Sequence, residues 1–298
     1  MRHLICATML MQFGVSGLKN RATAEERLFP EIERRLIPHS TKLGKPKPGE
    51  WLYEHKERGQ SFSRYLAARP IRRTKERSTI YLCLIGEFTR KQQLVLDLTR
   101  DYMSIFFDVP VKIHKKVAVK DIPKSAKRKH PQWGDKQILT DHVLNKILLP
   151  SRPKDALAYL AFTSSDLWPG KGWNFVFGEA SLRQRIGVWS IYRNGDPVKN
   201  FQQYLRRTLS TATHETGHIL TMEHCIVYEC SQNGSNSLPE SDRKPLHLCP
   251  TCLRKLCWNL QVNPKSYLTR LKKFCEKHKL EEEVKWYQLA LKTLSSKR

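Results

Sequence analysis

The stretch from Thr213 to Cys252 constrains this chain more than any other part of its sequence. It contains the pentapeptide His-Glu-Thr-Gly-His, a third histidine at position 224 and four cysteines. A residue advances about 100° around an α-helix, so His214 and His218 project from one face, one turn apart. Two imidazoles at this spacing can hold one cation, with Glu215 beside them.

The position of the third histidine indicates where this helix must end. His224 lies six residues after His218, about 240° further round if the helix simply continued. It can reach the same metal only if the helix breaks, and we place the break near Thr221. Three neutral imidazoles leave the fourth position of a zinc ion open for water, as in catalytic zinc sites. The spacing therefore predicts a zinc-peptidase site in which Glu215 is the base.

Four cysteines follow the histidines at metal-ligand spacing. They form a Cys-x4-Cys arm and a Cys-x-x-Cys arm: Cys225, Cys230, Cys249 and Cys252. Four thiolates close a tetrahedral zinc site and leave no open position, so such a site is structural. The sequence predicts two zinc ions per chain, one catalytic and one structural, with no shared ligand.

This combination resembles the archaemetzincin family of zinc peptidases, in which His-Glu-x-x-His-x5-His runs straight into the two cysteine arms. The matched core is Thr213 to Leu256, and a looser likeness extends upstream to about Ser78. The resemblance implies a zinc-dependent metallopeptidase that hydrolyses short peptides, with aminopeptidase action as one form. The alternative is a catalytically weak, zinc-stabilised protein that binds a peptide or an acidic partner.

The resemblance also implies where a peptide binds. In metzincins the edge strand above the zinc receives the peptide by β-addition, because a bare sheet edge offers unpaired N–H and C=O groups. Residues 173–180 would then form the upper rim, although the aromatic side chains of Trp173 and Phe175 have a simpler explanation as core residues. The substrate-binding residues implied are Gly178, Glu179 and Ala180. An N-terminal amine needs an acidic anchor, for which Glu179 and Glu223 are candidates.

Two residues depart from the family pattern. Thr221 stands where the family has glycine, and Gln232 stands where metzincins have methionine. Turning His224 back onto the metal commonly needs a left-handed residue, which costs about 1 to 2 kcal/mol when that residue carries a Cβ. A buried amide at position 232 must find hydrogen-bond partners. We therefore expect both zinc sites to form and turnover to be lowered.

The rest of the chain predicts an α/β fold, with α+β character, of the zincin or metzincin type. Continuous apolar runs indicate buried strands, and apolar residues at helical spacing indicate helices. Strands are expected at 79–86, 111–113, 117–119, 155–163, 173–177 and 185–192, and helices at 92–107, 139–148, 200–220, 264–279 and 281–297. This order implies a twisted, mostly parallel sheet, an active-site helix and a small zinc-bound C-terminal subdomain.

We predict an N-terminal extension, residues 1–76, and a metallopeptidase domain, residues 77–298, divided into subdomains 77–220 and 221–298. Within the extension, proline, glycine and repeated positive charge argue against a packed core. A short helix is expected within residues 50–66, with apolar contacts from Trp51, Tyr53, Phe62 and Tyr65. The resemblance implies that this segment packs on the catalytic domain.

The chain is strongly basic, with 53 Lys and Arg against 28 Asp and Glu, a formal charge of +25. Such a charge attracts acidic partners, including nucleic acid, without sequence preference. A lysine-rich solvated surface, including a loop at 124–133, is the simpler explanation because no nucleic-acid-reading motif is present. Thiolate ligands need reduced sulfur, which favours the cytosol or nucleus. The apolar run Leu4 to Phe13 keeps secretion open as an alternative, and it is too short to span a bilayer.

Overall fold

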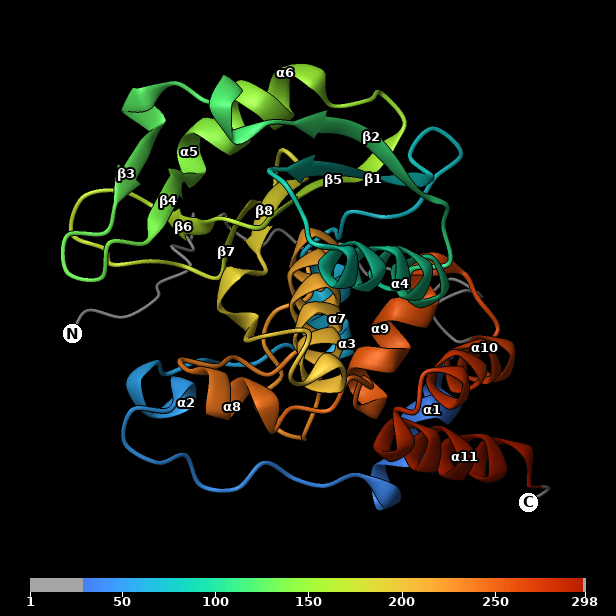
Figure 1. The fold of residues 1–298 in the computed structure, drawn as a ribbon. Coiled ribbons are helices and arrows are strands. Elements are labelled where there is room, and N and C mark those ends of the chain that lie inside the picture. The colour runs from blue at the N-terminus through green and yellow to red at the C-terminus, as the bar shows by residue number, and fades with distance from the viewer. Residues whose placement is uncertain (1–28, 297–298) are drawn as a thin grey trace, which may run out of the picture.

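The computed structural model describes residues 29–296, which form a twisted sheet with helices on both faces (Figure 1). Helices α5 (Thr140–His142) and α6 (Leu149–Ser151), joined by a π-helical segment, cover one face. Helices α4 (Arg90–Phe106) and α7 (Phe201–Ile219) lie on the other face and contact each other. The N-terminal apolar run, Leu4 to Phe13, lies outside the described residues.

The main sheet has the strand order β2-β1-β5-β8-β7. Its strands are β1 (Thr79–Ile85), β2 (Val111–Val117), β5 (Ala156–Thr163), β7 (Gly178–Ser181) and β8 (Ile186–Ser190). The first four strands in the order are parallel, and only β7 runs antiparallel to its neighbour β8. Strand β5 is buried over its whole length, as its continuous apolar run requires. The prediction of a mostly parallel sheet is confirmed.

A smaller sheet of β3 (Lys127–Lys129), β4 (Lys136–Leu139) and β6 (Asp166–Trp168) corrects the expectation of a plain basic loop at 124–133. Backbone pairing with β4 gives β3 its strand geometry even though all three of its side chains are basic. The segments 111–113 and 117–119 were expected as two strands. The single strand β2 spans the first and ends at Val117, the first residue of the second, because on an edge strand exposed lysines interrupt the apolar pattern without interrupting the backbone pairing.

The aromatic segment 173–177 is not a strand, which is a second correction. Within it Val176 makes one isolated bridge to Leu167, and the paired strand begins only at Gly178. Phe175 and Phe177 pack against each other edge to face, with ring centroids 5.5 Å apart. Aromatic residues favour strands only where cross-strand neighbours can receive them, and here they form their own cluster instead.

The predicted helices from residue 92 onward are confirmed with boundary shifts of a few residues, whereas the single short helix expected within residues 50–66 is two helices separated by a non-helical stretch. Pro150 lies inside α6 rather than beyond the helix, in the last turn of the continuous helical stretch 140–151. Helix α9 was not predicted. The remaining helices are α1 (Pro30–Leu36), α2 (Trp51–Glu54), α3 (Phe62–Ala67), α8 (Leu238–Asp242), α9 (Pro250–Leu260), α10 (Pro264–Lys277) and α11 (Glu281–Ser295), with the π-helical segment at Val143–Leu148 and short 3-10 turns at Ile37–His39, Val119–Asp121, Lys124–Ala126 and Tyr192–Asn194.

The segment upstream of β1 contributes to the core, so the composition argument against packing is wrong for its described part. Helix α1 contacts α9 and α11, and α3 contacts α9. Ile32 and Tyr65 are 1% and 0% exposed, whereas Tyr53 points to solvent. Isolated apolar side chains in a polar stretch are sufficient for docking when a preformed helical surface receives them.

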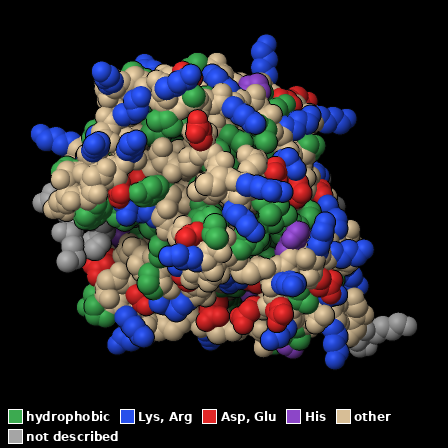
Figure 2. All heavy atoms as spheres, viewed as in Figure 1, with side chains coloured by type: hydrophobic (Ala, Val, Ile, Leu, Met, Phe, Trp, Pro, Cys, Tyr) green, Lys and Arg blue, Asp and Glu red, His purple; other side chains and the backbone are tan. Residues whose placement is uncertain are grey.

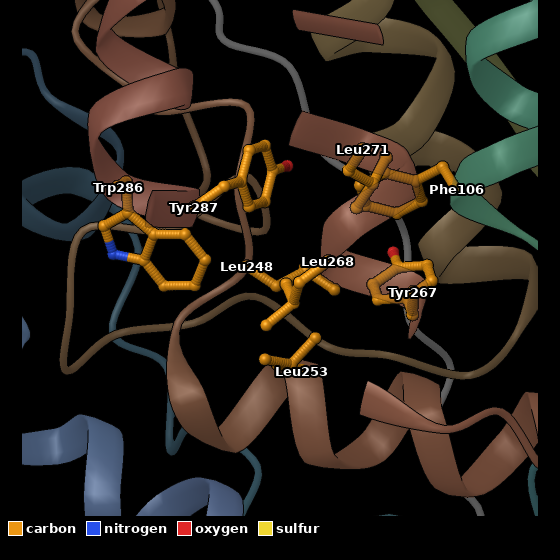
Figure 3. A pocket seen from close by; sticks show the side chains of 8 residues that line it. All are labelled: Phe106, Leu248, Leu253, Tyr267, Leu268, Leu271, Trp286 and Tyr287. Atoms are coloured by element: carbon orange, nitrogen blue, oxygen red, sulfur yellow. The ribbon is translucent and has the colours of Figure 1, made fainter. Parts of the chain in front are cut away.

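The C-terminal helices close on an apolar cluster that includes Leu248, Leu268 and Tyr287 (Figure 3). Side chains from α4, α9, α10 and α11 meet there, and the remaining gap is too small for a water molecule. This cluster therefore acts as packed core and offers no ligand pocket.

Lysine and arginine side chains are spread over the visible face, with acidic side chains between them, and do not gather into one continuous patch there (Figure 2). This distribution is that of a solvated basic surface. Within residues 29–296 none of the helices combines the length and apolar character that crossing a membrane requires.

Candidate metal centre

The three histidines of the sequence motif converge on one point. His214 and His218 lie one turn apart on α7, and their Nε2 atoms are 3.1 Å apart. The ligand nitrogens of these two residues and of His224 all lie within 4.8 Å of one another. Nitrogen ligands about 2.0 to 2.1 Å from a tetrahedral zinc stand roughly 3.3 Å apart, so these imidazoles fit a single ion.

The second ring nitrogen of each histidine is held by a hydrogen bond. His214 Nδ1 donates to the carbonyl oxygen of Ser231 (2.8 Å), and His218 Nδ1 donates to the carbonyl oxygen of Met222 (2.6 Å). His224 Nδ1 donates to the carboxylate of Glu57 (2.8 Å). A carbonyl oxygen or an ionised carboxylate can only accept a hydrogen bond, so in each histidine Nδ1 carries the proton and Nε2 keeps its lone pair. That tautomer is the one a metal ligand needs.

Burial determines the protonation state of the two histidines on α7. It lowers the pKa of His214 well below its ordinary value, and it lowers the pKa of His218 to about 3, with nearby His224 adding to the effect. Both imidazoles are therefore neutral at neutral pH, as ligation requires. Burial also raises the pKa of Glu215, whose carboxylate accepts no hydrogen bond from any residue between 29 and 296.

The break in α7 occurs where the histidine spacing predicted it. The helix ends at Ile219, and Thr221 adopts a left-handed conformation with φ of 69°. Its carbonyl oxygen accepts a hydrogen bond from the Gln60 side chain (3.0 Å), and its Oγ1 accepts one from the backbone N–H of Ile71 (3.2 Å). These two bonds offset the cost of a β-branched residue at positive φ.

Both bonds come from residues 41–71, which we call the N-terminal strap. The strap runs along the chain that follows α7, with Leu43 N–H bonded to the Val227 carbonyl and Glu229 N–H bonded to the Thr41 carbonyl. Gln60 also accepts from the backbone N–H of Glu223 (3.2 Å). The resemblance implied that this segment packs on the catalytic domain, but sequence reasoning missed its contacts to the site because its residues carry no metal-ligand pattern. Its contacts to the site span 150 and 161 positions of sequence, separations that local sequence patterns do not report.

Gln232 lies buried directly behind the metal-binding face of α7. Its side-chain nitrogen donates to the carbonyl oxygen of His214 (3.2 Å), while its Oε1 has no partner among the described residues. A Cβ added at Gly217 would come within 2.5 Å of this amide. Glycine at position 217 therefore allows close packing behind the metal-binding residues.

The four cysteines form a second cluster. Their Sγ atoms lie within 4.8 Å of one another, all four residues are buried, and the sulfurs of Cys225 and Cys249 are 3.6 Å apart. Thiolates about 2.3 Å from a tetrahedral zinc stand roughly 3.8 Å apart, so this set also fits one ion. Cys249 caps the N-terminus of α9 and Cys252 lies in its first turn, where the helix dipole favours thiolates.

Backbone N–H groups support the same cluster. The N–H groups of Cys249 and Gln232 point at the sulfur of Cys230, at 3.2 and 3.4 Å. Hydrogen bonds of this kind stabilise a charged acceptor more than a neutral one. The remaining described cysteines, Cys83, Cys257 and Cys275, are buried elsewhere and do not join the cluster.

The residues expected to bind substrate lie on β7, the outer strand of the main sheet, which contacts α7. Gly178, Glu179 and Ala180 pair with β8 on one side, and the sheet order places no described strand on the other. A hollow of about 480 Å³ opens between Phe175 and Phe177, which precede β7, and the segment 236–238.

The two acidic anchor candidates have different surroundings. The Glu179 carboxylate accepts a hydrogen bond from the Thr140 hydroxyl, a neutral partner. Glu223 lies 3.8 Å from the guanidinium of Arg64, which competes for its charge. The bond from Thr140 directs the Glu179 carboxylate towards α5, on the face of the sheet opposite α7, so neither residue is singled out as the amine anchor.

Known proteins resemble this chain in the region of these motifs. A sequence profile of Peptidase family M54 matches residues 153–257, the range that contains all seven candidate ligands. Archaemetzincin-2 of Homo sapiens is 33% identical over 277 residues, covering 81% of this chain and 76% of that protein. Archaemetzincin of Thermococcus kodakarensis is 40% identical over 116 residues, covering 37% of this chain and 61% of that protein.

The fold has a solved relative as well. The crystal structure of an archaemetzincin from Methanopyrus kandleri matches with a TM-score of 0.51 and 29% identity, covering 64% of this chain and 99% of that one. The likeness thus extends from the ligand motifs to the sheet and helices that carry them.

Proposed function

The chain belongs to the archaemetzincin family, a family of zinc metallopeptidases, and we propose that it hydrolyses short peptides as an aminopeptidase. We propose His214, His218 and His224 as ligands of the catalytic zinc and Glu215 as the catalytic base. Cys225, Cys230, Cys249 and Cys252 are proposed as ligands of a second, structural zinc.

One observation supports this proposal above all others. Three imidazoles meet through their Nε2 atoms while each Nδ1 atom is occupied by a hydrogen bond. Buried histidines that served packing alone would have no reason to aim three lone pairs at one point, since such an arrangement leaves acceptors without donors.

Zinc held by these residues would polarise the scissile carbonyl and acidify water. Glu215 accepts a proton from the attacking water as the new C–O bond forms. It then delivers that proton to the leaving nitrogen as the C–N bond breaks. Burial raises the pKa of Glu215 above that of an exposed carboxylate, which makes it a stronger base towards the attacking water.

The proposed substrate binds in extended form along β7. Backbone groups of Gly178, Glu179 and Ala180 pair with the peptide as an added strand, and the hollow beside Phe175 and Phe177 receives a side chain. An acidic anchor for the N-terminal amine, Glu179 or Glu223, would restrict cleavage to the end of the chain.

Digestion of a library of short peptides, with mass-spectrometric detection of the products, tests this proposal. We expect removal of N-terminal residues, no cleavage of N-acetylated peptides and loss of activity on chelation. Cleavage of acetylated peptides at internal bonds would replace the aminopeptidase assignment with endopeptidase action.

The variant Glu215→Gln separates the base from the ligands. It should retain zinc at both sites and lose most hydrolysis, because the amide cannot accept the proton. Loss of zinc together with activity would contradict the role given to Glu215. Full zinc loading of the natural protein without any cleavage would favour the alternative of a catalytically weak peptide-binding protein.

A further inference from the structure

We propose that Glu57, on the N-terminal strap, is a positioning residue of the catalytic zinc site, holding His224 in its metal-binding orientation. The inference rests on the proposed zinc site at His214, His218 and His224. It assigns a role to a residue far from the motif in sequence, in a segment that carries no metal-ligand pattern of its own.

His224 depends on outside support more than the other two ligands do. His214 and His218 belong to α7, whose backbone fixes their spacing. His224 follows the left-handed turn at Thr221 and lies outside any helix or strand. A ring on such a segment keeps one orientation only if its side chain is bound.

Glu57 provides that bond. Its Oε1 lies 2.8 Å from His224 Nδ1, and the same oxygen accepts a hydrogen bond from the Trp51 indole at 2.9 Å. The Trp51 and His224 rings meet edge to face, with centroids 5.0 Å apart. The side chains of His224 and Glu57 are 11% and 27% exposed. Two donors converge on one oxygen in a partly buried position, which fixes the carboxylate as well as the imidazole.

Trp51, which donates to the Glu57 carboxylate, is itself fixed by contacts with other parts of the chain. Its backbone N–H donates to Glu240 of α8 (2.9 Å), and α2 lies beside α8 (Figure 1). Its indole packs so closely on Gly234 that a Cβ there would lie 2.4 Å from the ring. Glycine at position 234 is therefore required for this contact.

The chain that follows Glu57 is fixed as well. Gly59, with φ of 63°, packs against Ile226, and the buried ammonium of Lys255 donates to the Gln60 side chain (3.1 Å). The carboxylate of Glu57 is thus carried by a segment anchored both before and after it.

A carboxylate bonded to the far nitrogen of a ligating histidine has a definite effect. It keeps the proton on Nδ1, orients the ring and makes Nε2 a stronger donor to the metal. An ordinary exposed ion pair would contribute little. The two possibilities differ in measurable terms, because only a positioning residue changes the affinity of the folded protein for zinc.

The test compares Glu57→Gln and Glu57→Ala with the natural full-length protein. The matched control is Glu54→Gln, which alters an exposed carboxylate on the same strap whose oxygen accepts from the Gly49 N–H. Zinc affinity is measured by competition with a chromogenic chelator. Cobalt(II) is then loaded in place of zinc, and its visible absorption spectrum reports the geometry of the ligand set.

We expect Glu57→Ala to weaken zinc binding at the histidine site by about 10- to 100-fold, the usual effect of losing such a partner. Glu57→Gln keeps an acceptor oxygen and should have a smaller effect. The four-cysteine site should keep its metal, kcat should fall with KM unchanged, and Glu54→Gln should match the natural protein in every measurement.

Several results would overturn the inference. Unchanged zinc affinity and cobalt spectrum in folded Glu57→Ala would do so, even if its melting temperature had fallen, because Glu57 would then only hold the strap. Should Glu57→Ala fail to fold, the same comparison is made on Glu57→Gln. A natural protein that binds no metal at the histidines would refute both this inference and the proposed function. If it binds metal and cleaves nothing, the proposed function alone fails, and weakened binding in the variants still supports Glu57.

Discussion

The side chain of Gln232 lies against Gly217, in the space that a Cβ at position 217 would need. An added Cβ would come within 2.5 Å of the amide nitrogen and within 2.8 Å of the amide carbon. The glycine of the His-Glu-Thr-Gly-His motif is therefore paired with a buried residue that follows the third histidine.

Gly217→Ala should test this pairing. Alanine gains about 1 kcal/mol over glycine inside a helix, but overpacking costs about 1 to 3 kcal/mol. We expect net destabilisation in the natural background. With Gln232→Ala present the clash is absent, so Gly217→Ala should become stabilising. Thermal or denaturant unfolding of the four proteins measures this reversal, and equal effects in both backgrounds would show that the two residues are independent.

Thr221 offers a second comparison, between Thr221→Gly and Thr221→Ala. Glycine relieves the positive φ but loses the hydroxyl that accepts from Ile71, and the two effects of about 1 kcal/mol each should nearly cancel. Alanine loses the same hydroxyl and keeps most of the strain. Denaturant unfolding should therefore rank Thr221→Ala about 1 kcal/mol below Thr221→Gly. The reverse order would mean that the turn stores no strain. That Thr221 lowers turnover stays a prediction, for which kcat of Thr221→Gly is the measurement.

The cysteine cluster can be tested with Cys249→Ala, using Cys257→Ala as the matched control. Both thiols are buried, but only Cys249 belongs to the four-sulfur group. Structural zinc contributes several kcal/mol of folding free energy, so Cys249→Ala should melt at a much lower temperature and bind one zinc fewer. Cys257→Ala should keep both ions by elemental analysis. Similar melting losses in the two variants would identify all these cysteines as ordinary core residues.

Alkaline stability follows from the buried phenols. Burial raises the pKa of Tyr102, Tyr267 and Tyr287 well above the ordinary value, and two of these lie in the apolar cluster of Figure 3. In the unfolded chain they ionise near pH 10. A folded pKa above the unfolded one contributes stability that is fully present below about pH 10 and is lost as the pH rises further. We expect phenolate absorbance and loss of circular dichroism to rise together, cooperatively, above that pH. Solvent-facing phenols such as Tyr53 ionise gradually in any case, so only complete ionisation of the tyrosines before unfolding would contradict the burial of these three hydroxyls.

The sequence predicted those parts of the site that depend on spacing along a helix or on residue chemistry. Helix geometry alone predicted that His214 and His218 project from one face and that the helix breaks near Thr221. The ligand preference of zinc predicted that the four cysteines form one group. The buried strands β1 and β5 were equally clear, because a strand covered on both faces must be apolar throughout.

The parts that escaped prediction depend on pairings across long stretches of chain. Glu57 meets His224 across 167 positions, and nothing near Glu57 distinguishes it from the other acidic residues of the strap. The strand β3 consists of lysine and arginine, so only its partner β4 defines it. Helix α9 begins inside the arm Cys249–Cys252, where metal-ligand spacing accounts for the cysteines without requiring a helix.

The packing of α1 and α3 on α9 also sets an order of events during synthesis. The strap leaves the ribosome long before α9, which is the surface that it docks on. At ordinary rates of about 5 to 20 residues per second, the two are separated by roughly 10 to 40 seconds. His214 and His218 are made only shortly before α9, so for most of that interval the chain contains none of the three metal-binding histidines. A nascent chain of this protein should therefore be unable to cut its neighbours, and its proteolytic capacity should appear only when the first-made and later-made segments come together.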